Sequence, residues 1–132
     1  MLEAVDVKAE LAGRPVLRER SPHTSAADTH AAFAVLAPFG NGSVFAGSFS
    51  GAGPWERHPN GDELVQVLAG STTLTVMMDD GPESVALTAG MLSVVPRGRW
   101  HRFHAPDQVT VLTATPLPTE HSRAEDPRTA GS

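Results

Sequence analysis

From residue 31 onward, hydrophobic residues occur in short runs, several of which alternate with polar residues. The runs cover residues 32–36, 43–49, 55–58, 63–68, 72–78, 84–87, 91–95, 100–104 and 109–114. Turn-forming stretches with glycine, such as residues 59–62 and 96–98, separate them at intervals of about ten residues. This pattern predicts tightly connected antiparallel strands in a sandwich or barrel.

The two ends of the chain lack this pattern. Residues 1–30 mix short apolar patches with Gly13, Pro15 and Pro22, and we expect an N-terminal arm with one short helical turn or edge strand. Residues 117–132 carry too few apolar groups to offset the entropy of ordering, so they predict a flexible C-terminal tail. The barrel is expected between them, over residues 31–116.

Composition narrows the class of protein. The chain has 132 residues, 40% of them hydrophobic, which fits one domain with a core, and 12 Gly and 11 Pro favour turns over long helices. A net charge of -5 without a Lys/Arg cluster argues against nucleic acid as a partner. Because neither a signal peptide nor a long apolar span is present, we expect a cytoplasmic protein without a membrane partner.

Candidate metal ligands lie around the turn at residues 59–62. The chain has no cysteine, so any metal must be held by His, Asp or Glu. Glu56 and His58 are two apart in a predicted strand and share one face, and the turn then returns the chain at Glu63. A hairpin of this shape can direct three donor groups to one point. His101 can supply a fourth donor if the barrel brings its strand alongside.

Two segments resemble the motifs of the cupin family. Residues 51–70 resemble the first motif, G-x5-H-x-H-x3-4-E-x6-G, with His58, Glu63 and Gly70 in place and Glu56 at the position of the first histidine. Residues 90–105 resemble the second motif, G-x5-P-x-G-x2-H-x3-N, with Ala105 replacing the last residue. The leading glycine of the first motif falls one residue late, at Gly51.

The resemblance implies an all-β fold, the RmlC-like cupin jelly-roll barrel. It also implies a divalent metal, Fe, Mn, Ni or Zn, held by Glu56, His58, Glu63 and His101. A carboxylate is an adequate ligand for these metals, so Glu56 can replace a histidine. Asp62 is an alternative to Glu63, since the motif allows three or four intervening residues. The other interpretation is a hydrogen-bonded polar cluster that lines an empty pocket.

The family resemblance leaves the reaction open, because one fold serves many activities. We expect a metal-dependent enzyme, dioxygenase-like or isomerase-like, acting on a small molecule. The alternative is a small-molecule-binding or sensing module without catalysis. The absence of tyrosine disfavours a metal-free epimerase, which in this family pairs a histidine base with a tyrosine acid. Small cupins commonly pair, so a homodimer is also expected; no catalytic residue or organic cofactor site is indicated.

Other polar and aromatic residues are weaker candidates. Trp55 and Trp100 each precede a candidate ligand, so alternation points them to the outer face. Arg97 and Arg99 lie at a turn where they could bind a substrate carboxylate at the barrel mouth, although solvated turn arginines are commoner. His104 should face away from the site, because it is three positions beyond the candidate ligand on the same strand.

Overall fold

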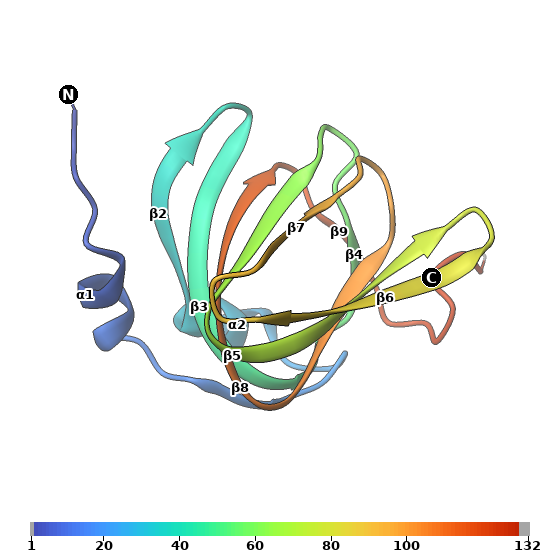
Figure 1. The fold of residues 1–132 in the computed structure, drawn as a ribbon, viewed down its shortest axis with the longest axis horizontal. Helices are drawn as coiled ribbons and strands as arrows, with labels where there is room; N and C mark the ends of the chain where they lie inside the picture. Colours follow the sequence, from blue (N-terminus) through green and yellow to red (C-terminus); the bar gives the residue numbers. More distant parts are fainter. Residues whose placement is uncertain (1, 130–132) are drawn as a thin grey trace.

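The computed structural model describes residues 2–129, and within them the chain forms nine strands and two short helices (Figure 1). In chain order these are α1 (Val7–Ala12), β1 (Leu17–Arg20), α2 (Ala26–Ala32), β2 (Phe33–Phe39), β3 (Gly42–Ala52), β4 (Trp55–Arg57), β5 (Glu63–Met78), β6 (Gly81–Thr88), β7 (Leu92–Val95), β8 (His101–Pro116) and β9 (Glu120–Ser122). The prediction of an all-β barrel is confirmed.

The strands form one sheet that curls on itself, and β5 and β8 hold it together. Strand β8 pairs with β3, β4 and β5, while β5 also pairs with β6 and β7. Except for the parallel pair of β1 with β3, these pairings are antiparallel. Each long strand therefore runs through both walls of the barrel, as Figure 1 shows.

The sequence pattern divided each of these long strands in two. We expected a turn at residues 69–71, but the structure continues β5 through it with a shift in register and a positive φ of 75° at Gly70. A Cβ at Gly70 would lie 2.2 Å from the carbonyl oxygen of Gln108. Glycine there permits a bend against the neighbouring strand instead of a reversal, because it has no side chain in the way.

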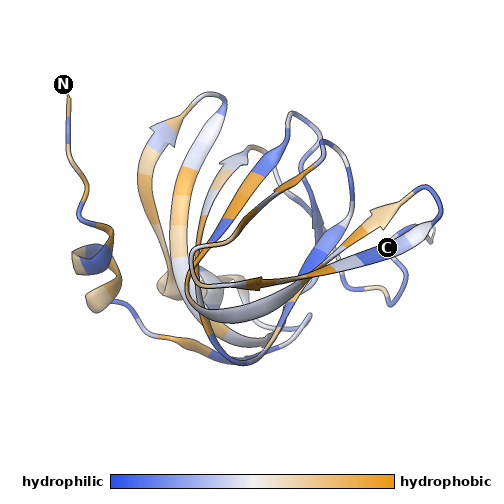
Figure 2. Cartoon of the chain, viewed as in Figure 1, coloured by the Kyte–Doolittle hydropathy of each residue, from blue (hydrophilic) through white to orange (hydrophobic). Residues whose placement is uncertain are grey.

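Alternation along the strands places apolar side chains inside the barrel, and Figure 2 shows the resulting bands of hydropathy. The fully buried members of the core include Phe49, Leu74, Val65, Val67, Val95, Val109 and Val111. A second buried cluster contains Trp55, Met77 and Trp100, with the guanidinium groups of Arg102 and Arg57 stacked 4.7 and 4.5 Å from the two indole rings. The tryptophans thus pack apart from the main core, as alternation predicted.

Both ends of the chain are more ordered than the sequence suggested. Strand β1 pairs with β3 of the same chain, and each helix begins at a side-chain cap, Asp6 for α1 and Ser25 for α2. Strand β9 lies in the predicted flexible tail, where it pairs with β4. The indole of Trp55 also donates a hydrogen bond to the carbonyl of Glu125. Backbone pairing supplies here the order that apolar content does not; residues 130–132 lie outside the described part.

No helix within residues 2–129 is both long enough and apolar enough to cross a membrane.

Candidate metal centre

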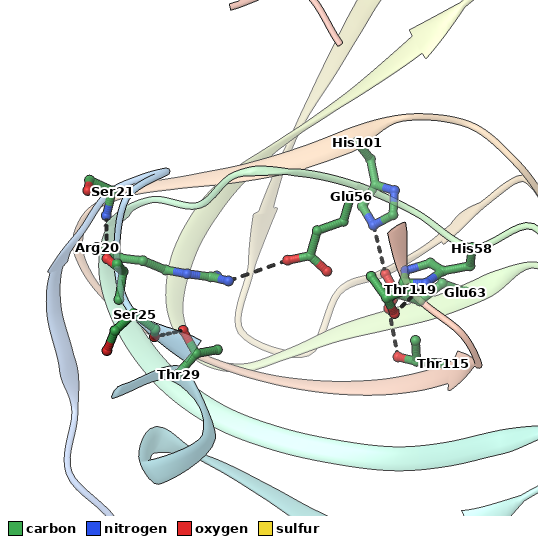
Figure 3. Close-up of polar contacts among 11 residues, drawn as sticks. Arg20, Ser21, Ser25, Thr29, Glu56, His58, Glu63, His101, Thr115 and Thr119 are labelled. Atoms are coloured by element: carbon green, nitrogen blue, oxygen red, sulfur yellow. Dashed lines mark hydrogen bonds and ion pairs between the residues drawn. The ribbon is translucent and has the colours of Figure 1, made fainter. Parts of the chain in front are cut away.

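Three predicted ligands meet inside the barrel, each from the end of a different strand (Figure 3). His58 follows β4, Glu63 begins β5, and His101 begins β8, opposite Glu56 of β4. The turn that returns the chain from His58 to Glu63 lies next to the turn before β8, because the amide of Gly98 donates to the carbonyl of His58. Strand ends from opposite parts of the sequence are thereby fixed around one point.

Glu63 lies between the two imidazole rings. Its Oε2 is 3.1 Å from Nε2 of His58, and its Oε1 is 3.1 Å from Nε2 of His101. The possible ligand atoms of the three residues all lie within 4.8 Å of one another, and all three side chains are buried. The group has the composition of a two-histidine, one-carboxylate site.

Each of the three side chains has a second partner that orients it. Nδ1 of His101 is 3.1 Å from the carbonyl oxygen of Arg99, so this nitrogen must carry the proton. Nδ1 of His58 is 3.0 Å from the hydroxyl of Thr119, and the hydroxyl of Thr115 donates to Oε2 of Glu63 at 2.6 Å. Both rings therefore direct Nε2 to the centre, which is how the protein orients a metal-binding histidine.

Charge coupling shifts the pKa values of this group. Burial raises the pKa of Glu63, but its contacts with His101 and then His58 outweigh burial and lower that pKa from 4.5 to about 2. Burial lowers the pKa of His101, whereas the carboxylates of Glu63 and then Glu56 raise it, and the net shift is upward. Without a metal, the favoured state is a carboxylate beside a protonated imidazole.

The donor set fits a divalent metal. Nε2 of His58 and Oε1 of Glu63 are buried and have no aligned hydrogen-bond partner among the described residues, although charged or polar atoms lie 3.1 Å away. The groups thus approach each other at ion-pair distance without hydrogen-bond geometry. A cation between them would satisfy these atoms, since imidazole nitrogens and a carboxylate suit Fe, Mn, Ni or Zn.

Glu56 points into the barrel as alternation predicted, but it lies outside this group of three. Its Oε1 pairs with Nη2 of Arg20 at 3.4 Å, and its side chain is 24% exposed. Glu56 remains close enough to His101 to raise the pKa of that imidazole. The structure brings together three of the four predicted ligands and directs the fourth to an arginine from β1.

A cavity of about 970 Å³ opens beside the candidate metal centre. Glu63, Thr113 and Thr115 form its polar end, and Phe45, Phe49, Phe103 and Val111 contribute apolar wall. The ends of the chain complete the wall, through the segment from Arg20 to Phe33 and the segment from Leu117 to Ala124. A cavity of this size and lining suits a small organic molecule.

The remaining sequence candidates lie elsewhere. Asp62 is exposed and accepts a hydrogen bond from the amide of Arg97, so its carboxylate braces a turn. The Arg97 side chain donates to the carbonyl of Pro59, and Arg99 pairs with Asp79 at 2.7 Å. His104 is exposed, in agreement with its predicted direction.

Sequence reasoning missed Arg20, Thr115 and Thr119. Arg20 and Thr119 come from the two ends, where no motif or periodicity marked them. Thr115 had a signal: it continues the alternation of Val109, Val111 and Thr113 on the inner face of β8. A threonine in a series of buried positions indicates a polar partner, and here that partner is Glu63.

Comparison with known proteins agrees with this architecture. The family model described as "Cupin domain" matches residues 50–115, which is half of the chain and includes all three members of the cluster. The chain belongs to the cupin family. A search of curated proteins found no match.

Solved structures share the fold at low sequence identity. Protein NMB1881 from Neisseria meningitidis is 17% identical with a TM-score of 0.61, over 91% of this chain and all of that one. A cupin-2 domain protein from Shewanella frigidimarina is 24% identical (TM-score 0.52; 70% and 82% covered). Hydroquinone 1,2-dioxygenase PnpCD, in complex with Cd2+ and 4-hydroxybenzonitrile, is 20% identical (TM-score 0.55; 64% of this chain), and the match spans 63% of that chain.

Proposed function

We propose that this cupin is a metal-dependent enzyme for a small organic molecule, with His58, Glu63 and His101 as the metal ligands. The observation that carries the proposal is the convergence of two Nε2 atoms and one carboxylate, buried and without aligned hydrogen bonds, at the edge of the cavity. Three protein ligands leave coordination positions free, and the cavity lies on the side where Glu63 reaches the surface of its wall.

A divalent metal held there supplies Lewis acidity or a binding position for oxygen. The chain's own groups would do the rest. The Arg99 carbonyl and the Thr119 hydroxyl keep both imidazole Nε2 atoms directed inward, and Thr115 holds one oxygen of Glu63. Apolar side chains such as Phe49 and Phe103 restrict water around the bound molecule, which strengthens electrostatic interactions.

The reaction would be of the dioxygenase or isomerase type. The dioxygenase type is supported by the two-histidine, one-carboxylate set, which is characteristic of non-haem Fe(II) oxygenases. A further support is that the same fold holds Cd2+ and 4-hydroxybenzonitrile in hydroquinone 1,2-dioxygenase.

Elemental analysis of tag-free protein tests the metal site. We expect close to one equivalent of Fe, Mn, Ni or Zn in the wild type and little in His58→Ala or His101→Ala. His104→Ala is the matched control, since this exposed histidine lies on the same strand as His101 and contacts none of the three ligands. Metal-free wild type that also refuses all four added metals would contradict the proposal.

Catalysis is tested on metal-loaded protein with a panel of small aromatic and aliphatic acids and phenols. Oxygen uptake would report dioxygenase chemistry, and proton NMR would report isomerisation. Turnover lost in His101→Ala but kept in His104→Ala supports the enzyme. Metal binding without turnover of any bound compound would instead favour a non-catalytic binding or sensing module.

We also propose that the protein is a homodimer. Leu92 and Val94 of β7 are 55% and 50% exposed, and both lie on the outer face of the sheet. Their cross-strand neighbours on β5 are Gln66 and Leu64. Exposed apolar side chains on neighbouring strands favour contact with another sheet face.

A further inference from the structure

Arg20 is a buried cation in the wall of the cavity. The residue is only 8% exposed, yet it lines the cavity beside Phe33, Phe49 and Glu56. The last position of β1 places it there, where Arg20 pairs with Gly51 of β3. Figure 3 shows the guanidinium directed along the barrel interior toward Glu56 and the cluster of His58, Glu63 and His101.

The surroundings of Arg20 are shaped to hold a guanidinium. Its central carbon lies 5.1 Å from the ring centre of Phe49 and 5.6 Å from that of Phe33, within the range of cation–π attraction. A Cβ at Gly53 would lie 2.9 Å from the same carbon, so glycine at that position makes room for it. The position of the charge is therefore built by three elements of the fold.

The protein uses little of this guanidinium's hydrogen-bonding capacity. Among the described residues, its only side-chain partner is Glu56, through a single contact of 3.4 Å, and Nε is buried without a partner. An arginine kept for structure would be expected to form short, paired hydrogen bonds with a carboxylate. A buried and incompletely paired arginine costs stability, which indicates that a ligand completes its contacts.

Formal charges around the cavity point in the same direction. With a divalent metal on His58, Glu63 and His101, the metal and Arg20 carry three positive charges, whereas Glu56 and Glu63 carry two negative ones. A monoanion would neutralise the remainder inside a poorly solvated cavity. The aromatic wall made by Phe33, Phe45, Phe49 and Phe103 would contact an apolar or aromatic body attached to that anion.

We propose that Arg20 binds the carboxylate of the substrate, and that the substrate class is small aromatic or apolar monocarboxylic acids. The inference rests on the proposed function for the location of the metal, but it concerns a separate residue on β1. Arg20 and Glu63 both line the same cavity, so a molecule held by its carboxylate at Arg20 presents its body toward the metal centre.

Titration calorimetry of zinc-loaded protein with benzoate tests this assignment. We expect benzoate to bind, and Arg20→Gln to weaken the affinity about 10- to 100-fold, because a hydrogen-bonded charge partner is lost. Arg18→Gln is the matched control, since Arg18 is exposed on the same strand. Benzamide, which has the same shape without the charge, should bind more weakly to the wild type and lose little in Arg20→Gln.

Two more variants keep the test valid if Arg20→Gln does not fold. Arg20→Lys retains the charge and most of the stem, and should bind benzoate with intermediate affinity. Glu56→Gln removes the anion that competes for Arg20, so it should tighten benzoate binding several-fold. Weaker benzoate binding in Glu56→Gln, or equal affinity in Arg20→Gln and the wild type, would overturn the proposal, as would a wild type that does not bind benzoate.

The zinc content of the same samples separates the two proposals. Arg20→Gln with full zinc and unchanged benzoate affinity overturns the carboxylate site and leaves the metal site standing. Wild type that takes up no zinc but binds benzoate in an Arg20-dependent manner supports the carboxylate site while the metal-dependent function fails.

Discussion

Glu63 contacts a different imidazole through each of its two oxygens, so its charge is coupled to both rings. The folded-state pKa of about 2 lies below its ordinary value of 4.5. A depressed carboxyl pKa contributes stability above the unfolded value and loses it as the pH falls toward the folded value. The shift corresponds to a contribution of about 3 kcal/mol in the metal-free protein.

His101 has the opposite dependence. Its pKa is raised above 6.5, so its contribution is complete below that value and disappears as the pH rises through the folded pKa. We therefore predict that chelator-treated protein is most stable between pH 4.5 and 6.5 and loses stability on either side. Urea unfolding across this range measures the effect.

Two comparisons check this pH prediction. His101→Gln should flatten the loss of stability on the alkaline side, because the titrating imidazole is gone. Metal-loaded wild type should gain stability over the same alkaline range, since metal binding requires unprotonated imidazole. A metal-free wild type whose stability is independent of pH above 6.5 would show that His101 is not coupled to Glu63 in this way.

Gly70 and Gly98 share a φ of 75° but have different surroundings. Nothing lies within 4 Å of a Cβ at Gly98, whereas at Gly70 the Gln108 carbonyl oxygen is 2.2 Å away. We predict that Gly98→Ala costs about 1–2 kcal/mol from backbone conformation alone. Gly70→Ala should cost at least about 2 kcal/mol more. Equal losses in urea denaturation would show that β8 moves aside freely.

At the scale of single residues, the sequence identified the inward direction of Glu56 but not its partner. Alternation correctly places Glu56 and His58 on one face of the barrel. The arginine that pairs with Glu56 lies 36 positions earlier, in a segment without motif or period. Local spacing specifies the direction of a side chain, whereas its partner depends on how distant strands pair.

At the scale of elements, β9 and the residues before it support the candidate metal centre from outside the matched domain. Thr119 lies just before β9, and its hydroxyl is 3.0 Å from Nδ1 of His58. We predict that Thr119→Val lowers metal affinity about 10- to 100-fold, the usual effect of removing such an orienting partner. Metal titration against a competing chelator measures this.

Thr75→Val is a control for Thr119→Val. The hydroxyl of Thr75 contacts Ser84 on the exposed side of the sheet, away from the cluster. This variant should retain the metal affinity of the wild type. If Thr119→Val also retained it, the hydrogen bond to His58 would have no role in orienting the ring.

Most strands could be predicted from the sequence, but the lengths of the longest could not. Hydrophobic alternation marked both halves of β5 and of β8, while glycine and polar residues between the halves suggested turns. In the barrel those residues form register shifts between neighbouring strands. A turn and a bend have similar local composition, and pairing partners decide between them.

At the scale of the whole molecule, we predict that the exposed pair on β7 mediates self-association. Leu92→Asp combined with Val94→Asp should convert a dimer to a monomer in analytical ultracentrifugation, because charged groups cannot be buried against a second apolar face. Val35→Asp, on the separate exposed strand β2, is the control and should leave the dimer intact. A monomeric wild type would contradict the homodimer.

The cavity joins two parts of the chain with different relations to the cupin family. The metal cluster lies within residues 50–115, whereas Arg20, Phe33 and Thr119 in the cavity wall lie outside that segment. In evolution, the flanking segments can therefore vary to accept new substrates while the reactive centre keeps its ligands. Exchange of both flanks between related barrels should transfer substrate preference, with the chemistry of the shared centre unchanged.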